Sequence, residues 1–240
     1  LPPQEGLIRA VERALAPASL FELVKGDDER PDVALLDLAA SEHEARAALR
    51  ALPAGRGVPV LVLGDVRRLG PEPILACLAE GGVEYLDTSR LADPLGLESL
   101  ARELSERLLS ASSLHVTRRP PTKGRRKETS RMPGRHKVVA IGVSTGGPSA
   151  LQKVIPLLPK DLGAAVLIVQ HLASPFTGSL ADSLRSSSAL DVREAREGDR
   201  LEPGVALVTP GESHLEVDPD GKVALRPAGK DSRYVPSIDL

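Results

Sequence analysis

The amino-acid sequence predicts an α/β protein built from two doubly wound parallel-sheet domains that a basic linker joins. In both halves of the chain, short apolar runs typical of buried strands alternate with segments of helical spacing. Residues 110–137 interrupt this alternation, and a chain of 240 residues has room for two ordinary domains. We therefore expect one domain over residues 1–109 and a second over residues 138–240.

The composition of the chain excludes several classes of protein. Hydrophobic residues make up 41% of the chain, which is enough for a buried core, and the formal net charge of −2 provides no general attraction to nucleic acids or membrane surfaces. The single cysteine, Cys77, excludes an internal disulfide and a cysteine-rich zinc site. No apolar run approaches the roughly 20 residues of a membrane-spanning helix. We expect a soluble, cytoplasmic protein without nucleic-acid binding or membrane insertion.

The predicted elements of the first half follow a regular order. Helical spacing extends over residues 7–15, 42–52, 74–80 and 97–109, and apolar runs of strand length cover residues 32–38, 58–63 and 83–86. Buried strands that alternate with helices pair in parallel, because each helix provides the crossover to the next strand. The first half is therefore expected to form a parallel sheet with helices on both faces.

Residues 110–137 differ from both halves. They contain a Pro-Pro pair, several Ser and Thr, no apolar periodicity, and nine Lys or Arg against one Glu. Such a segment cannot bury enough apolar surface to offset the entropy that ordering it would cost. We interpret it as a flexible interdomain linker. The alternative is a basic docking strip for an acidic partner or for phosphate.

One predicted strand of the first half ends near a carboxylate. The segment PDVALLDL covers residues 31–38 and has Asp37 next to its last position. With this order of elements, the first half resembles a response-regulator receiver domain, which has a flavodoxin-type fold. Asp37 lies where that family carries its phosphate-accepting aspartate. Without the resemblance, Asp37 is a strand-end residue that caps a turn.

The first half also departs from the receiver pattern at three places. Only Gln4 and Glu5 are found near the expected acidic pair, Gly64 replaces the expected hydroxyl residue, and Asp87 replaces the expected lysine. Phosphoryl transfer depends on positioned cations that stabilise the charge of the transferring group. We therefore predict a degenerate receiver that is retained for interaction and does not hold an aspartyl phosphate well.

The second half opens with a strand, a glycine turn and a helix. A predicted strand over residues 138–142 leads into Gly142-Val-Ser-Thr-Gly-Gly147, and residues 149–158 have helical spacing. The turn matches the pattern G-x-S-x-G, in which a serine projects from a sharp bend and the glycines let backbone and substrate approach closely. The N-terminal amides of the following helix favour a developing oxyanion.

This turn also has two other interpretations. A Gly-Ser-Thr-Gly-Gly turn before a helix can cradle phosphate, or it can be a structural turn with an N-capping serine. It lacks the G-K-[ST] ending of a P-loop, which argues against a nucleotide triphosphatase. It also lacks the full G-x-G-x-x-G fingerprint of a dinucleotide site.

A histidine follows the next predicted strand. Residues 165–169 form a buried apolar run that ends in Gln170 and His171. The carboxyl ends of parallel strands meet at one sheet edge, and neighbouring strands lie about 4.8 Å apart. We therefore expect a hydrogen bond between Ser144 and His171, with His171 as the general base. His214, after a Pro-Gly turn, is a second candidate. We interpret the remaining histidines as bystanders: His43, His115 and His136.

Four segments of the second half carry a family resemblance. They are VVAIGVSTGGPSALQKVIPLLPKD, VLIVQHLASPFTGSLADSL, EAREGDRLEPGVALVTPGESHLEV and VPSIDL. In this order they closely resemble the Rossmann-like catalytic domain of the chemotaxis protein-glutamate methylesterases, the CheB family. The resemblance implies Ser144 as the nucleophile and His171 as the base. It also implies that Thr145, Gly146 and Gly147 line the oxyanion and substrate site.

The resemblance implies a reaction and its partners as well. The substrates would be methylated glutamate side chains on the cytoplasmic signalling helices of chemoreceptors, with deamidation of receptor glutamines as a side activity. A chemotaxis histidine kinase would be a partner of the receiver-like half. The chemistry requires no metal and no organic cofactor. A catalytically weak interaction module of a chemosensory system is the alternative function.

The resemblance leaves the third member of a catalytic triad to be found. In the family it is an aspartate in a glycine-rich loop well after the PSID segment, which here would lie beyond Leu240, so we expect a catalytic domain that is incomplete at its C-terminus. The aspartates of the second half lie in segments with other apparent roles, and none is assigned to the triad: Asp182, Asp191, Asp199 and Asp239.

Overall fold

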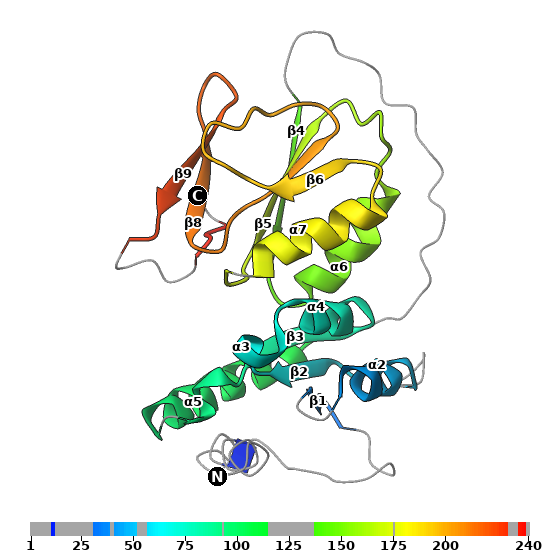
Figure 1. The fold of residues 1–240 in the computed structure, drawn as a ribbon, viewed down its shortest axis with the longest axis vertical. Helices are drawn as coiled ribbons and strands as arrows, with labels where there is room; N and C mark the ends of the chain where they lie inside the picture. The colour runs from blue at the N-terminus through cyan, green and yellow to red at the C-terminus, as the bar shows by residue number, and fades with distance from the viewer. Residues whose placement is uncertain are drawn as a thin grey trace. The chain divides into compact units, whose positions relative to one another are not determined.

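The computed structural model describes residues 11–12, 31–38, 41–51, 57–92, 94–114, 137–174, 176–229 and 235–238. They belong to two compact units, residues 1–119 and 120–240, each with its own parallel sheet (Figure 1). The expected α/β class is therefore confirmed. The boundary falls inside the predicted linker, of which residues 115–136 lie outside the described part, as do most residues of the helix predicted over 7–15.

The first unit contains a three-stranded sheet. Its strands are β1 (Ala34–Asp37), β2 (Val60–Gly64) and β3 (Gly82–Asp87), which pair in parallel in the order β1-β2-β3. The helices are α2 (Glu42–Ala51), α3 (Val66–Leu69), α4 (Glu72–Ala79), the 3-10 helix η1 (Ser89–Ala92) and α5 (Pro94–Ser112). All three predicted strands are present, whereas α3 and η1 were not predicted.

Helices cover both faces of this sheet, as expected. Leu61 and Leu63 of β2 belong to one core cluster with Leu100 and Leu104 of α5. On the opposite face, β2 and β3 contact α4, and in Figure 1 the sheet lies between α4 and α5. The helix α5 extends to Ser112, three residues past the domain end expected at residue 109, because its buried stripe continues through Ala111.

The second unit contains a four-stranded parallel sheet. Its strands are β4 (Val138–Val143), β5 (Ala165–Gln170), β6 (Asp191–Glu194) and β7 (Val205–Val208), in the order β4-β5-β7-β6. The helices α6 (Gly147–Val154) and α7 (Phe176–Ser187) lie on one side of this sheet, with the 3-10 helix η2 (Ile155–Leu157) after α6 (Figure 1). An antiparallel hairpin of β8 (Ser213–Val217) and β9 (Val223–Pro227) follows.

The two faces of the second sheet are covered differently. Leu167 of β5 shares a core cluster with Leu215 of β8 and Val223 of β9, so the hairpin packs on one face. Side chains alternate along a strand, which directs Val166 and Ile168 to the other face, towards the helices. A doubly wound sheet was expected to have helices on both faces, but within the described residues the hairpin occupies the second face.

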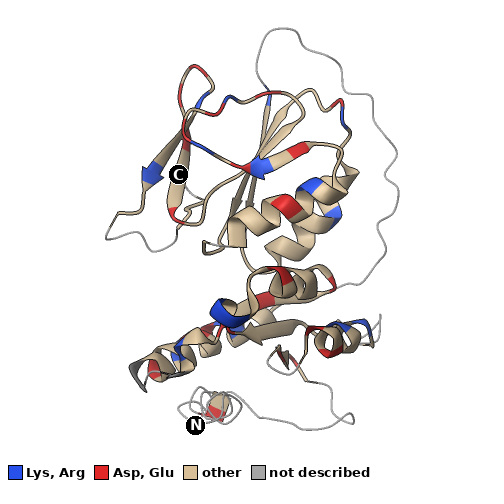
Figure 2. Ribbon diagram, viewed as in Figure 1, with Lys and Arg blue, Asp and Glu red and all other residues tan. Residues whose placement is uncertain are grey.

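Acidic and basic residues are interspersed over both units (Figure 2). In the part of the chain that the structure describes, every helix is too short or too polar to cross a bilayer. The same described residues contain no cluster of three His, Cys, Asp or Glu side chains placed to hold a metal ion.

Candidate active site

A tight turn connects β4 to α6 and carries Ser144. The N–H of Gly147 donates to the carbonyl of Ser144 over 2.8 Å, which closes the turn, and Gly146 adopts the left-handed conformation at φ 77°. Residues with a Cβ rarely adopt that conformation, which explains a glycine at this position. The helix begins at Gly147, two residues earlier than the sequence predicted, so only Thr145 and Gly146 separate the serine from its first turn.

His171 leaves the adjacent strand at the same level. The strands β4 and β5 pair in parallel with Val143 opposite Gln170, so the next residue of each strand lies at the same sheet edge. The Oγ of Ser144 lies 3.2 Å from the Nδ1 of His171. The hydrogen bond expected between these side chains is therefore present, with Ser144 exposed and His171 half-buried.

The imidazole presents Nδ1 to the serine. In the serine-protease arrangement, the nitrogen that faces the serine is Nε2. Nδ1 can accept the Ser144 hydroxyl proton only if the neutral ring carries its own proton on Nε2. The atom of His171 that can act as a base in this structure is therefore Nδ1.

A third side chain contacts the backbone of both residues. Gln170, the last residue of β5, is 1% exposed. Its Nε2 donates to the carbonyl of Ser144 over 3.1 Å and to the carbonyl of His171 over 3.2 Å. The sequence prediction did not include Gln170. The available signal was an amide on the buried face of an apolar strand, where Val166 and Ile168 precede it with the same alternation.

The second candidate histidine has a different environment. His214 lies in β8, is buried, and accepts a hydrogen bond at Nδ1 from the N–H of Ser237 over 3.0 Å. A neutral His214 with its proton on Nε2 therefore anchors the segment that contains Ser237. The structure pairs Ser144 with His171.

The remaining predicted bystanders are accounted for as follows. His43 is exposed on α2, in agreement with its interpretation as a surface residue, and Asp191 is exposed at the start of β6. His115, His136 and Asp239 lie outside the described residues.

Two other aspartates of the second unit have partners of their own. Asp182, on α7, forms an ion pair with Arg185 over 2.8 Å. Asp199 accepts from a guanidinium nitrogen of Arg193 over 2.5 Å and from the N–H of Arg196 over 2.7 Å. Burial raises the pKa of Asp199, but these bonds more than offset that effect and lower the pKa below its usual value. Both residues therefore have structural contacts, which agrees with leaving them out of the site.

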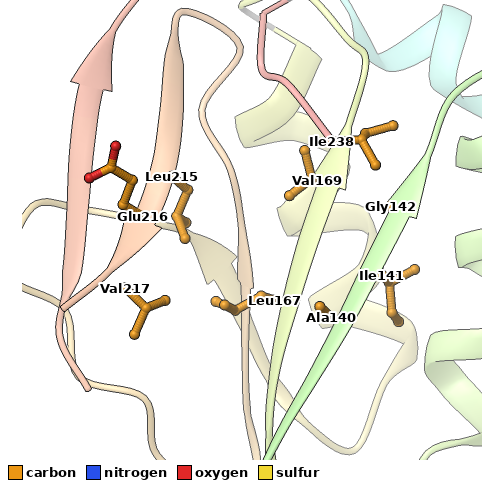
Figure 3. Close-up of a pocket in the computed structure, with 9 residues that line it drawn as sticks. All are labelled: Ala140, Ile141, Gly142, Leu167, Val169, Leu215, Glu216, Val217 and Ile238. Carbon is orange, nitrogen blue, oxygen red and sulfur yellow. The ribbon is translucent and has the colours of Figure 1, made fainter. Parts of the chain in front are cut away.

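An apolar pocket of about 450 Å³ lies on the hairpin side of the sheet (Figure 3). Ile238 covers Gly142 in this pocket, since a Cβ on that glycine would lie 2.4 Å from the Cγ2 of Ile238. Ser144 and His171 are not among its lining residues, so it is separate from the hydrogen-bonded pair. The lining residues are Ala140, Ile141, Gly142, Leu167, Val169, Leu215, Glu216, Val217 and Ile238.

At the carboxyl edge of the first sheet, Asp87 is engaged with backbone groups. Its Oδ1 accepts from the N–H of Val66 over 3.3 Å and from the N–H of Ser89 over 3.0 Å, and its Oδ2 accepts from the Ser89 hydroxyl over 2.7 Å. Asp37 ends β1 at the same edge, where Gly64 ends β2. The Asp87 carboxylate therefore organises a loop at this edge, at the position where the resemblance to receivers predicts a lysine.

Comparison with known proteins shows a similarity in the second unit. Residues 139–240 match the family model described as CheB methylesterase. The chain is 35% identical over 201 residues to a protein of Oceanobacillus iheyensis, covering 78% of this chain and 56% of that protein. It is 35% identical over 229 residues to one of Symbiobacterium thermophilum, covering 88% of this chain and 63% of that protein. Both are named protein-glutamate methylesterase/protein-glutamine glutaminase.

A solved structure is also similar to the chain. The crystal structure of the CheB methylesterase catalytic domain of Thermotoga maritima is 41% identical in sequence to this chain over the matched part. The match covers 44% of this chain and 58% of the Thermotoga chain, with a TM-score of 0.41. The chain thus spans less than two thirds of the length of the two relatives named above. Their coverage of 78% and 88% of this chain extends beyond residues 139–240 into the first half.

Proposed function

Since residues 139–240 belong to the CheB methylesterase family, we propose that the chain is a serine hydrolase that removes methyl esters from glutamate side chains of chemoreceptors. The observation that carries the proposal is the 3.2 Å contact between the Ser144 hydroxyl and the His171 imidazole, inside the matched segment. The names of the relatives support the substrate class. The receptor domains that carry such esters would be cytoplasmic, and so would this protein.

The first half of the reaction forms an acyl-enzyme. The Nδ1 of His171 takes the Ser144 proton while Oγ attacks the ester carbonyl and forms a tetrahedral intermediate. When this intermediate collapses, the bond to the methoxy group breaks and His171 returns the proton, so methanol leaves. Ser144 then carries the glutamyl group as an ester.

The second half of the reaction restores the serine. His171 removes a proton from water as the water oxygen attacks the acyl carbonyl, and the bond to Ser144 then breaks with return of the proton to Oγ. The products are a glutamate side chain and free enzyme. A glutamine substrate follows the same route with ammonia as the leaving group, which is how one site could also act as a protein-glutamine glutaminase.

The turn after Ser144 supplies groups for the developing oxyanion. We assign the donor role to the N–H groups of Thr145 and Gly146, because they lie in the turn between Ser144 and the start of α6. Gly147 is buried at the start of α6, where a Cβ would meet the side chain of Gln170. The N-terminal turn of α6 adds a favourable dipole next to the site.

The first unit would be a degenerate receiver joined to the hydrolase through the basic segment between α5 and β4. The engagement of Asp87 with Val66 and Ser89 supports this proposal, because a carboxylate and not a lysine side chain ends β3, where a positive charge would help to retain an aspartyl phosphate. Interaction with receptors or with a chemotaxis histidine kinase would then be its role. The basic composition of the linker suits an acidic partner surface.

The test is release of methanol from a receptor domain with methylated glutamates. Ser144→Ala is expected to lower the rate by roughly a thousandfold or more, because the acyl-enzyme cannot form. The matched control is Ser186→Ala, which removes an exposed α7 hydroxyl that donates to the Ser183 carbonyl of its own helix. Equal methanol release by Ser144→Ala and the control would rule out the serine mechanism.

A further inference from the structure

We propose that Gln170 is a positioning residue whose side-chain amide holds the backbones of Ser144 and His171 at the spacing that proton transfer requires. The inference rests on the proposed function, because it assigns roles to this serine and histidine. The Nε2 of Gln170 donates to the carbonyls of both residues, over 3.1 and 3.2 Å. An amide nitrogen carries two hydrogens, so both bonds form at once.

The orientation of the amide is determined by its partners. The two groups that face Nε2 are carbonyl oxygens, which only accept hydrogen bonds. A flipped amide would direct Oε1 at two oxygens and lose both bonds. Gln170 therefore acts as a bridge between the turn after β4 and the turn after β5.

A purely structural role does not explain an amide at this position. Val166 and Ile168 fill equivalent buried positions of the same strand with hydrocarbon, at no cost in lost hydration. The Oε1 of Gln170 is buried and has no hydrogen-bond partner among the described residues. An unsatisfied buried oxygen destabilises a fold, so the amide is better explained by its bonds to the two site residues.

The Gln170 amide occupies the space that a side chain on residue 147 would need. A Cβ on Gly147 would lie 1.9 Å from the Oε1 of Gln170 and 2.8 Å from its Cδ. The backbone of Gly147 is helical and not in the left-handed region, and Pro148 adds a moderate cost for any residue with a Cβ before it. The three atoms nearest to that Cβ, chain neighbours aside, all belong to the side chain of Gln170, so a methyl group on residue 147 would displace the amide.

The bridge matters for the reaction because small displacements are costly. The Ser144 carbonyl receives hydrogen bonds from Gly147 N–H and from Gln170, which together fix the orientation of the turn that carries Oγ. The same amide donates to the carbonyl of His171 and so fixes the backbone of that residue as well. A displacement of about 1 Å between reacting groups can lower a rate by roughly a hundredfold.

The first test replaces the amide. Gln170→Leu is expected to lower kcat for methanol release by roughly tenfold to a hundredfold, with KM changed less than about threefold, since the substrate does not contact this buried side chain. The matched control is Gln152→Leu, on α6, whose amide lies 3.5 Å from the Ser183 hydroxyl. The control is expected to keep wild-type kcat.

A substrate-independent readout accompanies the assay. A fluorophosphonate reagent reacts when the Ser144 Oγ attacks phosphorus, an O–P bond forms, the P–F bond breaks, and the hydroxyl proton passes to His171 as fluoride leaves. Gln170→Leu is expected to slow this labelling in parallel with kcat. If Gln170→Leu is labelled more slowly than the wild type, but the wild type releases no methanol from the receptor domain, the proposed function is overturned and the bridge is supported.

A second variant separates the hydrogen bonds from general loss of structure. Gln170→Glu directs a carboxylate at two carbonyl oxygens near neutral pH, and burial raises the pKa of such a carboxyl. As the pH falls, the protonated acid can donate one of the two bonds. The labelling rate of Gln170→Glu, divided by that of the wild type to cancel the titration of His171, is expected to rise with falling pH. The same ratio for Gln170→Leu is expected to stay flat.

A pair of small substitutions tests the contact with Gly147. Gly147→Ala alone is expected to slow labelling by roughly tenfold, because the new methyl group displaces the amide. In a Gln170→Ala background the collision with the amide is gone and only the cost before Pro148 remains, so Gly147→Ala is expected to slow labelling less than it does in the wild type. Fully additive effects of the two substitutions would overturn the bridge.

The remaining outcomes are also decisive. Wild-type labelling and methanol release in Gln170→Leu would overturn the bridge and leave the proposed function intact. A wild-type chain that resists the reagent would overturn the bridge, because no activated serine would exist to be positioned. If Gln170→Leu does not fold, which thermal unfolding reports, the pH ratio of Gln170→Glu and the Gly147 pair decide.

Discussion

Ser144 and His171 meet because each is the first residue after one of two adjacent parallel strands. Neighbouring strands lie about 4.8 Å apart, and the pairing of Val143 with Gln170 puts both residues at the same level. A serine and a histidine at such positions need only suitable rotamers to form the 3.2 Å contact. The chemistry of the site thus follows from the register of β4 and β5.

The sequence predicted this pair, and the structure adds two details at the same scale. It presents Nδ1 of His171 to the serine, and it places the amide of Gln170 against both backbones. Neither detail could be read from the sequence, because side-chain torsions depend on packing with residues that are distant in the chain. The spacing of apolar residues predicts only which side of a strand is buried.

Asp37 offers a residue-scale prediction about the first unit. Incubation with acetyl phosphate is expected to leave no stable label on Asp37, because Asp87 presents a carboxylate in place of a cation and uses it to bind Val66 and Ser89. Intact-mass spectrometry of the treated chain, with Asp37→Asn as the control, measures the label. A stoichiometric phosphate that Asp37→Asn lacks would show that the receiver chemistry is retained.

At the scale of elements, the strongest signals in the sequence became correct strands and helices. The predicted strands over residues 32–38, 58–63 and 83–86 correspond to β1, β2 and β3, and the runs 138–142 and 165–169 correspond to β4 and β5. The predicted helices over residues 42–52, 74–80 and 97–109 correspond to α2, α4 and α5. Each of these segments has several apolar residues at one period, which is the pattern that propensity and burial reinforce together.

The unpredicted elements lack that reinforcement. The strand β6 has four residues with Val192 as its only buried one, and α3 has four residues, none of them buried. The strand β7 does have an apolar run, Val205–Val208, but its position between β5 and β6 depends on pairing across the chain. Such non-local pairing leaves no local pattern, so the order of the sheet could not be predicted.

Asp199 gives an element-scale prediction, because it links β6 to the turn that follows. Asp199→Asn is expected to lower the free energy of unfolding by about 1–2 kcal/mol at pH 7, through weakened bonds to Arg193 and Arg196. Urea unfolding of both chains measures the difference. The matched control, Asp182→Asn, alters a surface pair whose carboxylate is 67% exposed and is expected to cost less than about 0.5 kcal/mol.

The same pair predicts a pH dependence. Folding lowers the pKa of Asp199, so its ion pair stabilises the folded state fully at any pH above the pKa of an unfolded Asp, about 3.9. It is lost as the pH falls through the lower folded value, where the carboxylate protonates. The difference between wild type and Asp199→Asn should therefore shrink in acid. A difference that grew as the pH fell would contradict the assigned bonds.

At the scale of the whole molecule, two sheets of the same class have different chemistry. The first unit has a carboxyl edge where Asp87 is bound by backbone N–H groups, while the second unit has a serine and a histidine in contact at the corresponding edge. Residues 139–240 match the CheB methylesterase family, whereas receiver chemistry in the first unit is opposed by Gly64 and Asp87. We therefore propose acyl transfer at the edge of the second sheet and no phosphoryl transfer at the edge of the first.

The most direct test of the central claim is mass spectrometry of the chain, acid-quenched during turnover of a methylated receptor peptide. We expect a covalent adduct on the proteolytic peptide that contains Ser144, with the mass of the receptor peptide less methanol. The adduct should be absent from Ser144→Ala. If the wild-type chain turns over the peptide but carries no adduct on Ser144, or carries it on another residue, Ser144 is not the nucleophile.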